Sequence, residues 1–565
     1  MIATKLKTLK NNFKNFKIDG YVVPKNDEFF SEYDSNNRLK TISNFSGSAG
    51  YAVILKDKNF LFVDGRYTLQ AQLEAGKNFK IKNYQEIYNC KLFKNLTLGV
   101  DPKLFTSSQL KKIFLRFNRF KPLETNLIDL LEKNSLNNKK PFFSLRDNIT
   151  GINYKKKINK VVNYLTTKKL DYIFVTAPEN VAWLMNIRGF DNPNSPVPNC
   201  RLLLSKKRKI YIVAEKKKVS KLIGEGKIRS SQVIETNNFN QLLSTLKKGK
   251  ISIDEKTCSL YYENILLNKF KLIKKEDPIY FLKAVKNKKE IDNMIQSHII
   301  DGVALTKFLY WIKNINKKKI TEYDAQNKLQ KFRKLNTKYL YPSFNTIAGS
   351  GKNAAIIHYR ASKKNAKVIE KNEIFLCDSG GQYKYGTTDV TRTICFNRPK
   401  KNIKNIFTKV LKGHIAVANT KINSFRTGNL IDFQARKFLR KINLDYQHGT
   451  GHGVGFFLNV HEGPQSLSKL NKTKILEGMV LSNEPGYYKK GKFGIRIENL
   501  LYVKKIEKKI FFKNLTLVPI EKDLIDFEQL TFEEKNYLFR YHLEVYVKLS
   551  KYLNKREKKW LASFI

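Results

Sequence analysis

Two stretches in the N-terminal half of the chain repeat one pattern, and this repeat constrains the fold more than any other feature. Residues 17–24 (KIDGYVVP) resemble residues 169–175 (KLDYIFV). In each, a short run of β-branched or aromatic residues follows a helix-like stretch and ends near a Pro/Asn turn. The repeat predicts two consecutive domains of similar α/β fold, at residues 1–150 and 151–280.

The similarity continues downstream of both stretches. Residues 44–47 (NFSG) match residues 186–189 (NIRG), and residues 60–64 (FLFVD) match residues 209–213 (KIYIV). Neither half contains a Walker loop or a GxGxxG after a strand, so a nucleotide-binding domain is not indicated.

The rest of the chain has a different pattern. At 565 residues the protein is too long for one hydrophobic core. Residues 286–315 carry Lys, Glu, Ile and Leu at helical spacing, which predicts a long amphipathic helix. Strand-like segments and glycine turns alternate up to about residue 505. Residues 528–565 again have a helical, charged pattern, and their candidates for core packing are Tyr541, Leu543, Val545, Leu549 and Trp560.

The formal net charge of +58 suggests a polyanion partner at first sight. The lysines are spread along the whole chain with many Asn, Ile, Tyr and Phe, whereas nucleic-acid-binding proteins concentrate their charge on one face or segment. We interpret the charge as the compositional bias that AT-rich codons produce, and expect no specific nucleic-acid partner. The alternative, a functional polyanion surface, predicts tight DNA binding with a steep salt dependence.

The cysteines and the apolar runs indicate a cytoplasmic protein. The cysteines are odd in number, lie far apart and form no CxxC pair: Cys90, Cys200, Cys258, Cys377 and Cys395. This pattern argues against a disulfide framework and fits a reducing compartment. No apolar run approaches the length of a membrane span, so no membrane partner is expected. The basic N-terminus lacks the apolar core of a signal peptide, and a first helix is favoured over a transit peptide.

Histidine is scarce but clustered. The chain has seven histidines, and His448, His452 and His461 fall within fourteen positions, in the segment HGTGHGVGFFLNVHEGP. The glycines between them allow the backbone to approach a ligand closely. Because histidine is the commonest metal ligand and acid/base side chain, the cluster indicates a functional site.

Carboxylates lie on the N-terminal side of this cluster. Residues 374–381 (IFLCDSGG) and 386–393 (GTTDVTRT) predict a hairpin with a Gly/Tyr/Lys turn. Asp378 interrupts an apolar strand, where an unpaired carboxylate is costly. Asp389 lies among β-branched neighbours, so the two acids can converge on one face of the hairpin.

A second pair of carboxylates lies on the C-terminal side. Residues 479–486 (MVLSNEPG) and 494–500 (GIRIENL) predict another hairpin, with residues 489–492 (KKGK) as its turn. Glu484 and Glu498 each end an apolar run. Four such acids around a histidine cluster call for cations to neutralise them.

Two divalent ions would balance the four carboxylates, and His452 would add a neutral nitrogen ligand. Mixed oxygen and nitrogen ligation favours Mn, Co, Fe or Zn over a thiolate-type zinc site. A hydroxide that bridges two such ions is a nucleophile at neutral pH, and the second ion polarises a carbonyl. The residues therefore predict metal-assisted hydrolysis.

These motifs resemble those of the pita-bread metallopeptidases in their order: an Asp, a second Asp eleven positions later, HxxGHxxG, Glu-Pro-Gly and a final Glu. Residues 378–383 (DSGGQY), 388–393 (TDVTRT) and 448–464 are similar to the Xaa-Pro aminopeptidase (aminopeptidase P) branch. Residues 45–50 (FSGSAG) and 63–67 (VDGRY) resemble the first domain of that branch.

The resemblance covers essentially the whole chain and implies an α/β (α+β) protein of the long, three-domain form. It implies two creatinase-like N-terminal α/β domains (1–150 and 151–280), a pita-bread catalytic domain (281–505) and a short helical C-terminal extension (506–565).

The resemblance also implies the metal ligands. Asp389 and Glu498 would bridge two divalent ions, with Mn2+ expected and Co2+, Fe2+ or Zn2+ as alternatives. Asp378 would complete one ion, and His452 with Glu484 would complete the other. Glu484 would also serve as general base for the bridging water.

Three histidines have implied catalytic roles. His461 and His358 would lie near the scissile amide, and His448 would line the proline side of the site. Imidazoles of this kind supply donors where negative charge develops.

The implied function is removal of the residue that precedes a proline in second position of a peptide, by a homodimer joined through the catalytic domain. A prolidase-type dipeptidase is the nearest alternative, since it differs mainly in how it holds the free carboxylate of a dipeptide. Creatinases lack the metal ligands, and methionine aminopeptidases lack the two leading domains. A non-catalytic pita-bread binder of nucleic acid or protein is a more distant alternative.

Overall fold

The computed structural model describes residues 2–33, 37–65, 67–89, 93–114, 119–132, 140–314 and 319–565. The chain divides into two compact units. One contains residues 1–147 and 152–279, and the other contains residues 148–151 and 280–565. Cys90 and Arg66, which belong to two of the sequence patterns above, lie outside the described residues.

The first unit begins with a six-stranded sheet in the order β4-β3-β2-β1-β5-β6. Its strands are β1 (Gly20–Pro24), β2 (Tyr51–Leu55), β3 (Asn59–Val63), β4 (Lys80–Asn83), β5 (Thr97–Val100) and β6 (Arg119–Pro122). The helices of this part are α1 (Ile2–Asn11), α2 (Arg38–Ser43), α3 (Thr68–Ala75) and α4 (Ser107–Ile113). Strands β1, β2 and β3 pair antiparallel, and the outer strands join them in parallel. The apolar side chains of the sheet pack against those of α1 and α4 in two core clusters.

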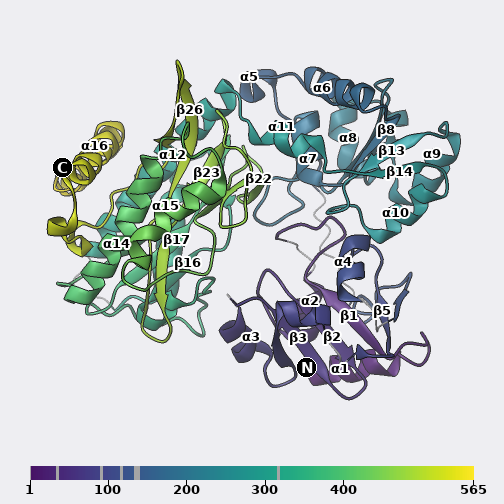
Figure 1. Ribbon diagram of the computed structural model, residues 1–565, viewed down its shortest axis with the longest axis horizontal. Helices are drawn as coiled ribbons and strands as arrows, with labels where there is room; N and C mark the ends of the chain where they lie inside the picture. Colours follow the sequence, from purple (N-terminus) through teal and green to yellow (C-terminus); the bar gives the residue numbers. More distant parts are fainter. Residues whose placement is uncertain are drawn as a thin grey trace. The chain divides into compact units, whose positions relative to one another are not determined.

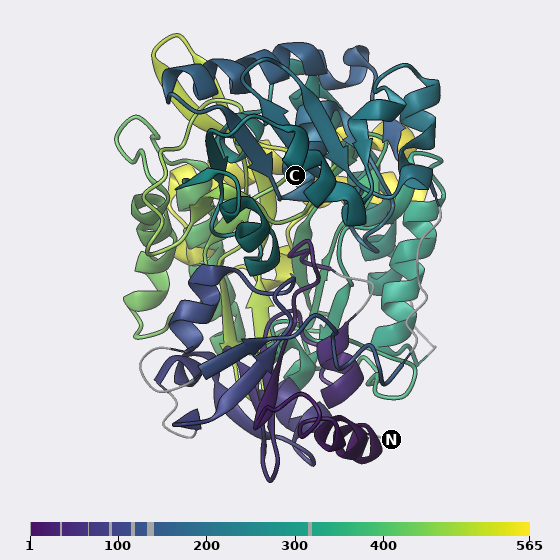
Figure 2. The ribbon, with the colours of Figure 1, turned by 90° about the vertical axis from the view of Figure 1, so that its right-hand side faces the viewer.

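A second six-stranded sheet in the same unit has the order β12-β11-β10-β8-β13-β14. Its strands are β8 (Tyr172–Val175), β10 (Arg201–Ser205), β11 (Ile210–Val213), β12 (Val233–Ile234), β13 (Lys250–Ile253) and β14 (Lys271–Lys274). The helices are α6 (Tyr154–Thr167), α7 (Pro178–Met185), α8 (Lys216–Gly224), α9 (Phe239–Thr245) and α10 (Leu260–Leu267). Each pair of neighbours has the same direction as its counterpart in the first sheet. Both sheets can be followed in Figure 1 and Figure 2.

The sequence repeat has a structural reason at one pair of matched residues. Asn44 ends α2 in the left-handed conformation with φ of 67°, and Asn186 ends α7 in the same conformation with φ of 50°. Asparagine tolerates this conformation better than most residues. The expected pair of similar α/β folds is therefore confirmed, down to the residues that end equivalent helices.

The second unit contains two main sheets, each covered by its own pair of helices. One sheet has the order β16-β17-β20 and the other β22-β21-β23-β26-β27. Their strands are β16 (Ile347–Ser350), β17 (Phe375–Ser379), β20 (Val390–Ile394), β21 (Gly451–Gly453), β22 (Glu462–Leu467), β23 (Val480–Asn483), β26 (Asn499–Ile506) and β27 (Lys509–Asn514). Helices α12 (Lys288–Asn314) and α13 (Glu322–Lys334) share a core with the first sheet. Helices α14 (Lys401–Ala418) and α15 (Gly428–Arg440) share one with the second sheet.

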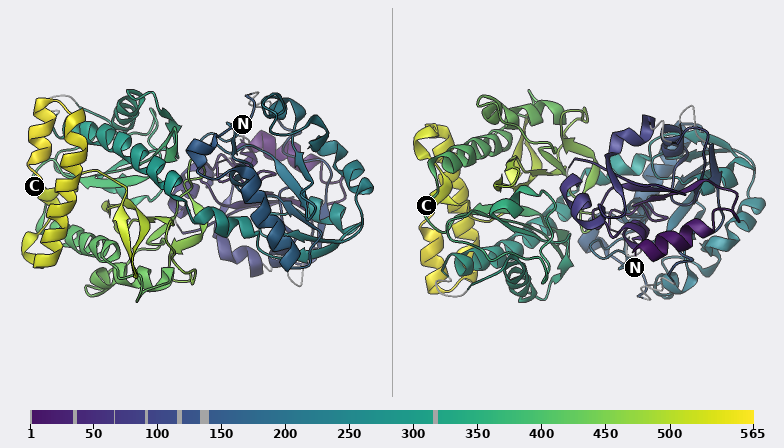
Figure 3. Two further views of the ribbon diagram at one scale, coloured as in Figure 1. Left: turned by 90° about the horizontal axis from the view of Figure 1, so that it is seen from above. Right: turned by 90° about the horizontal axis from the view of Figure 1, so that it is seen from below.

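The long helix expected at residues 286–315 is α12, and the mixed helix-and-sheet fold expected for the chain is confirmed. The C-terminal segment forms α16 (Phe532–Leu549) and α17 (Lys555–Ala562), which both contact α12 (Figure 3). Tyr541, Val545 and Leu549 are buried there, whereas Leu543 is 40% exposed. An assignment of Leu543 to the core, based on its apolar character, is thus wrong because it lies on the outer face of α16.

Cys200, Cys258, Cys377 and Cys395 are buried free thiols. Among the described residues, no helix combines the length and the apolar character that crossing a bilayer requires.

Candidate metal centre

The first pair of acids lies on two neighbouring strands. Asp378 is in β17, and Asp389 immediately precedes β20. The two strands pair antiparallel, with Ser379 opposite Val390, so the acids lie at the same end of the ladder. Both carboxylates are buried, at 8% and 4% exposure. The residues between them are more than a turn, because they form β18 (Gly381–Tyr383) and β19 (Gly386–Thr387), which join β15 (Tyr339–Pro342) in a separate sheet.

The second pair has the same arrangement. Glu484 immediately follows β23 and Glu498 immediately precedes β26, and these strands pair with Asn483 opposite Asn499. The expected turn at residues 489–492 belongs to a nested hairpin of β24 (Gly486–Lys489) and β25 (Phe493–Arg496). Each hairpin prediction brings its two acids together, but its second strand spans two strands of the structure: β19 and β20 in the first hairpin, β25 and β26 in the second.

Two hydrogen bonds join the two pairs of acids. The backbone N–H of Glu498 donates to the carbonyl oxygen of Thr391 at 3.1 Å. The Thr391 hydroxyl donates to the Glu498 carboxylate at 2.8 Å. Since Thr391 lies in β20, these bonds connect the two main sheets at the point where the acids meet.

His452 of β21 lies between the two pairs. Its Nε2 is 3.6 Å from Asp389 Oδ2 and 3.5 Å from Glu484 Oε1. Asp389, His452 and Glu498 each offer one ligand atom within 4.8 Å of the others. The His461 ring lies 4.1 Å from the His452 ring, and His461 is exposed, so it lies on the open side of the cluster.

The cluster carries more negative charge than the surrounding protein balances. Asp378 Oδ1 and Asp389 Oδ1 are buried and have no hydrogen-bond partner within the described residues. Burial, then the neighbouring carboxylates of Asp389, Glu484 and Asp378, raises the pKa of Glu498 well above its ordinary value. Burial raises the pKa of Asp378 to about 7, against the opposing effect of the Arg496 guanidinium. Such unsatisfied oxygens and raised pKa values are what a divalent cation would correct.

His452 and Glu484 shift each other in the opposite sense. Burial alone would lower the pKa of His452, but its contact with Asp389 and the charge of Glu484 raise it to about 9. Burial alone would raise the pKa of Glu484, but the imidazoles of His452 and His448 lower it. A protonated His452 thus supplies part of the positive charge that these acids require.

The other predicted histidines differ in how closely the structure ties them to the cluster. His448 is held at both ring nitrogens: Nδ1 lies 2.7 Å from the Gly449 carbonyl oxygen and Nε2 lies 2.9 Å from the Tyr488 hydroxyl. Burial lowers the pKa of His448 to about 4, so the ring is neutral near pH 7. His358 is half-buried in the loop after the short helix η5 (Gly351–Ala355), which packs against β25.

A second group of potential ligand atoms lies elsewhere in this unit, at Cys395, Glu521 and Asp523. Lys313 already supplies a cation there, because its ammonium donates to Glu521 at 2.8 Å and to Asp523 at 3.1 Å. A cation of the protein itself thus balances this group, whereas no lysine or arginine of the described residues pairs with Asp389.

Known proteins align with the whole chain. A probable Xaa-Pro aminopeptidase P of Laccaria bicolor is 35% identical over 593 residues, covering 99% of this chain and 92% of the relative. Xaa-Pro aminopeptidase 1 of Dictyostelium discoideum is also 35% identical, covering 100% of this chain and 96% of the relative. The model for metallopeptidase family M24 matches residues 292–505. The chain belongs to metallopeptidase family M24.

Further family models match the flanking parts of this M24 protein. The creatinase/prolidase N-terminal domain matches residues 5–131 and 133–290, and the C-terminal region of peptidase M24 matches residues 509–563. An X-prolyl aminopeptidase from Caenorhabditis elegans, described as a cytosolic enzyme with a di-nuclear active site, superimposes with a TM-score of 0.91. It is 30% identical, and the match covers 100% of this chain and 99% of that one. The chain is thus a metal-dependent aminopeptidase, as the sequence predicted.

Two side chains of the M24 centre were missed by the sequence reasoning. The Arg496 guanidinium donates to Asp378 at 2.5 Å, to the Tyr488 hydroxyl at 2.6 Å and to Thr391 Oγ1 at 3.0 Å. Tyr488 in turn bonds His448. A signal for Arg496 exists, since it is a basic residue inside the apolar run FGIRIEN. Burial of a charge in such a run requires a nearby partner, here Asp378.

Proposed function

We propose that Asp378, Asp389, His452, Glu484 and Glu498 hold two divalent metal ions. The observation that carries this proposal is the convergence of three buried carboxylates and the half-buried carboxylate of Glu484, with unpaired Oδ1 atoms on Asp378 and Asp389. Carboxylate oxygens with one imidazole suit Mn2+, which we propose as the working metal, with Co2+, Fe2+ and Zn2+ as alternatives.

Two ions bound there would supply the hydrolytic chemistry by activating a water and polarising the scissile carbonyl. Glu484 is the general base in this proposal. Its Oε1 accepts a hydrogen bond from the Ser482 hydroxyl at 3.0 Å, which fixes its position. The neighbouring imidazoles keep the pKa of Glu484 below its ordinary value despite burial, so the carboxylate is ionised and can accept a proton.

The histidines have separate proposed roles. His461 lies beside His452 and is exposed, so its imidazole can donate to the negative charge that develops on the substrate. His448 is a neutral ring fixed by Gly449 and Tyr488, and we place it along the proline side of the substrate. His358 is proposed to assist at the scissile amide.

The proposed substrate is a peptide with proline in second position. The similarity to Xaa-Pro and X-prolyl aminopeptidases over the whole chain supports this substrate. Proline needs a dedicated site because its tertiary amide lacks an N–H and its φ is fixed. The test is hydrolysis of an Xaa-Pro-Yaa tripeptide against the dipeptide Gly-Pro. Cleavage of the dipeptide alone would instead favour a prolidase-type enzyme.

The metal proposal has its own test. Removal of metal from the purified protein should abolish hydrolysis, and Mn2+ should restore it. Asp389→Ala should lower kcat by about a thousandfold or more, since it removes a ligand proposed to be shared by both ions. Asp292→Ala is the matched control, because Asp292 is an exposed acid on α12. Unchanged activity in Asp389→Ala would refute the proposed dinuclear site.

We further propose that the protein is cytoplasmic and acts as a homodimer joined through its catalytic domain, with no specific nucleic-acid or membrane partner. The cytosolic description of the Caenorhabditis elegans enzyme supports the location. Size-exclusion chromatography with light scattering tests the dimer: a mass near the chain mass of 65.9 kDa would refute it.

The proposed domain limits are 1–150, 151–280, 281–505 and 506–565. The two similar sheets and the residues matched by the family models support them.

A further inference from the structure

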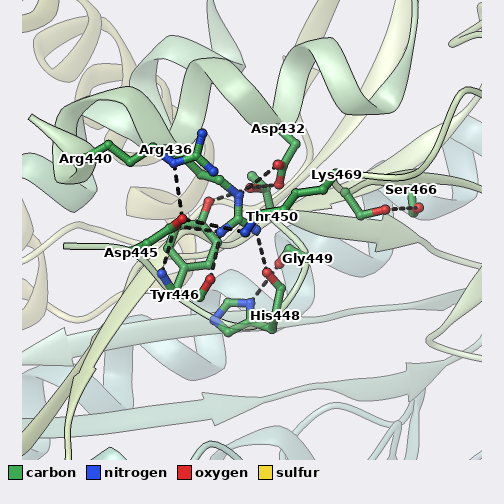
Figure 4. A network of polar contacts seen from close by, with 11 residues as sticks. Asp432, Arg436, Arg440, Asp445, Tyr446, His448, Gly449, Thr450, Ser466 and Lys469 are labelled. Carbon is green, nitrogen blue, oxygen red and sulfur yellow. Dashed lines mark hydrogen bonds and ion pairs between the residues drawn. The ribbon is translucent and has the colours of Figure 1, made fainter. Parts of the chain in front are cut away.

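Side chains on one face of α15 contact the loop that carries His448 (Figure 4). This loop runs from the end of α15 at Arg440 to the start of β21 at Gly451. Asp432 and Arg436 lie four residues apart on α15, so their side chains share a face of the helix. Both are buried, at 2% and 1% exposure, and both point at the loop.

Arg436 bonds the loop at three points. Its guanidinium donates to Asp445 Oδ1 at 2.7 Å, to the Tyr446 carbonyl oxygen at 2.7 Å and to the His448 carbonyl oxygen at 2.6 Å. A further N–H donates to Asp432 Oδ2 at 2.8 Å. Two of these acceptors are main-chain atoms, so Arg436 fixes the path of the backbone on both sides of residue 447.

Asp432 completes the attachment at the far end of the loop. Its Oδ1 accepts a hydrogen bond from the Thr450 hydroxyl at 2.7 Å, and that hydroxyl also contacts the Tyr446 hydroxyl. The loop is therefore attached at residues 445, 446, 448 and 450 to two side chains of one helix turn.

The same contacts determine where the imidazole lies. The Arg436 guanidinium stacks 4.0 Å from the centre of the Tyr446 ring, and the Tyr446 ring lies 4.9 Å from the His448 ring. His448 is thus supported by Tyr446 on one side and bonded to Tyr488 on the other. A shift of Arg436 would move the tyrosine support and the His448 backbone together.

We propose that Arg436, together with Asp432, is a positioning residue of the peptidase reaction that acts by fixing His448. Within the described residues it contacts none of the five proposed metal ligands, so its effect passes through the His448 loop. This inference rests on the proposed role of His448 in substrate binding.

The test is a double-mutant cycle on the Mn2+-loaded enzyme with an Xaa-Pro-Yaa substrate. Arg436→Met should lower kcat/KM by about 10- to 100-fold, the usual effect of misplacing a contact group by an ångström. In a His448→Ala background the same substitution should cost about twofold or less, the ordinary limit of additivity. If the double variant loses kcat/KM by the product of the two single-variant losses, the two residues act independently and the proposal is wrong.

Two further variants separate positioning from folding. Arg436→Lys keeps the cation beside Asp432, but an ammonium cannot replace the fork that reaches both carbonyl oxygens. Arg436→Lys should fold and lower kcat/KM by less than Arg436→Met does. This loss in kcat/KM should also disappear in the His448→Ala background, and a loss that persists there counts against the proposal. Arg440→Met is the matched control, since Arg440 is an exposed arginine of the same helix that contacts Asp445 alone in this network, at 3.1 Å. Its kcat/KM should stay within about twofold of the parent value.

A readout without activity tests the inference independently of the proposed function. The chain has seven histidines, so 13C-labelled histidine gives a resolvable set of ring signals, with that of His448 assigned by its absence in His448→Ala. Arg436→Met should shift or broaden this signal, and Arg440→Met should not. If the His448 signal of Arg436→Met stays at its parent position, with or without loss of bound metal, Arg436 does not position His448. Absence of Xaa-Pro hydrolysis in the parent protein would refute the proposed function and leave this spectroscopic test valid.

Discussion

A buried carboxylate next to His461 provides a demanding test of the electrostatic reasoning. Glu462, the first residue of β22, accepts a hydrogen bond from Lys283 at 2.9 Å and another from Lys286. All three side chains are almost fully buried, with exposures of 1% for Glu462, 3% for Lys283 and 1% for Lys286. Glu462→Gln keeps the shape of the side chain and removes the charge that both ammonium groups face.

The expected loss follows from this burial. Breaking a buried ion pair by removing one partner costs about 3–5 kcal/mol, because a charge is left uncompensated. At about 2–4 °C per kcal/mol for a large domain, Tm of the catalytic unit should fall by roughly 10 °C. This is a large share of the 5–15 kcal/mol that stabilises a typical domain.

The loss should depend on pH in a defined direction. Burial lowers the pKa of Lys286 below its ordinary value, and Glu462 opposes that shift. Without Glu462 the pKa of Lys286 in the folded variant falls further. At any pH between this lowered pKa and the ordinary pKa of lysine, the folded variant binds fewer protons than the unfolded chain. Its stability therefore rises with pH through this window. The difference in Tm between the parent and Glu462→Gln should shrink from pH 7 to pH 9.5.

Differential scanning calorimetry of the metal-free proteins at both pH values measures the effect. Glu528→Gln, at an exposed glutamate, should change stability by about 0.5 kcal/mol or less and serves as the control. A parent-like Tm in Glu462→Gln would refute the reasoning, as would a loss that is the same at both pH values.

Three other outcomes follow from the structure. Mn2+ added to weakly buffered apo-protein at pH 7 should release protons, because without metal the pKa of Asp378 is about 7 and that of His452 is about 9. Metal affinity should therefore rise with pH. An indicator dye that records no proton release would contradict this expectation. Arg392→Lys should cost roughly 2–4 kcal/mol by denaturant unfolding, because one lysine ammonium cannot reach all the acceptors that the Arg392 guanidinium reaches, among them Pro519, Glu498 and Asn499. A loss below about 1 kcal/mol would contradict this expectation. Binding to a random DNA duplex should be weak and lost near 150 mM salt. A submicromolar Kd at that salt would instead support a functional polyanion-binding surface as the reason for the +58 charge.

Three acids of the proposed metal centre could be singled out from sequence because each breaks a local rule. Asp378 lies inside an apolar strand, and Glu484 and Glu498 end two others, so the misfit is visible without knowledge of the fold. The partners of these acids were not predictable in the same way. Arg496 lies 118 positions from Asp378, and Thr391 lies 107 positions from Glu498. Only the pairing of strands brings them together.

The fold shows the same division. The repeat in the N-terminal half predicted two similar sheets because each strand is a short local run bounded by a turn. The predicted strand segments at residues 386–393 and 494–500 each span two strands of the structure, β19 with β20 and β25 with β26, because the local sequence does not show where one short strand ends and the next begins. Leu543 was misplaced for a related reason, because periodicity fixes the faces of a helix but not which apolar residue of a mixed face meets the core.

The buried acids of the catalytic unit, compared with one another, give the strongest structural argument for metal. Several have a basic partner within hydrogen-bond distance: Asp301 with Arg333, Asp432 with Arg436, Glu462 with Lys283 and Lys286, and Glu521 with Lys313. Asp389 differs, because the cationic group nearest to it is His452 at 3.6 Å and its Oδ1 has no partner among the described residues. The same unit that supplies lysines and arginines to buried acids elsewhere leaves this carboxylate without one. A chain with a charge of +58 does not lack basic residues, so the absence of a lysine or arginine beside Asp389 within the described residues supports the proposal that an ion from solution neutralises this carboxylate.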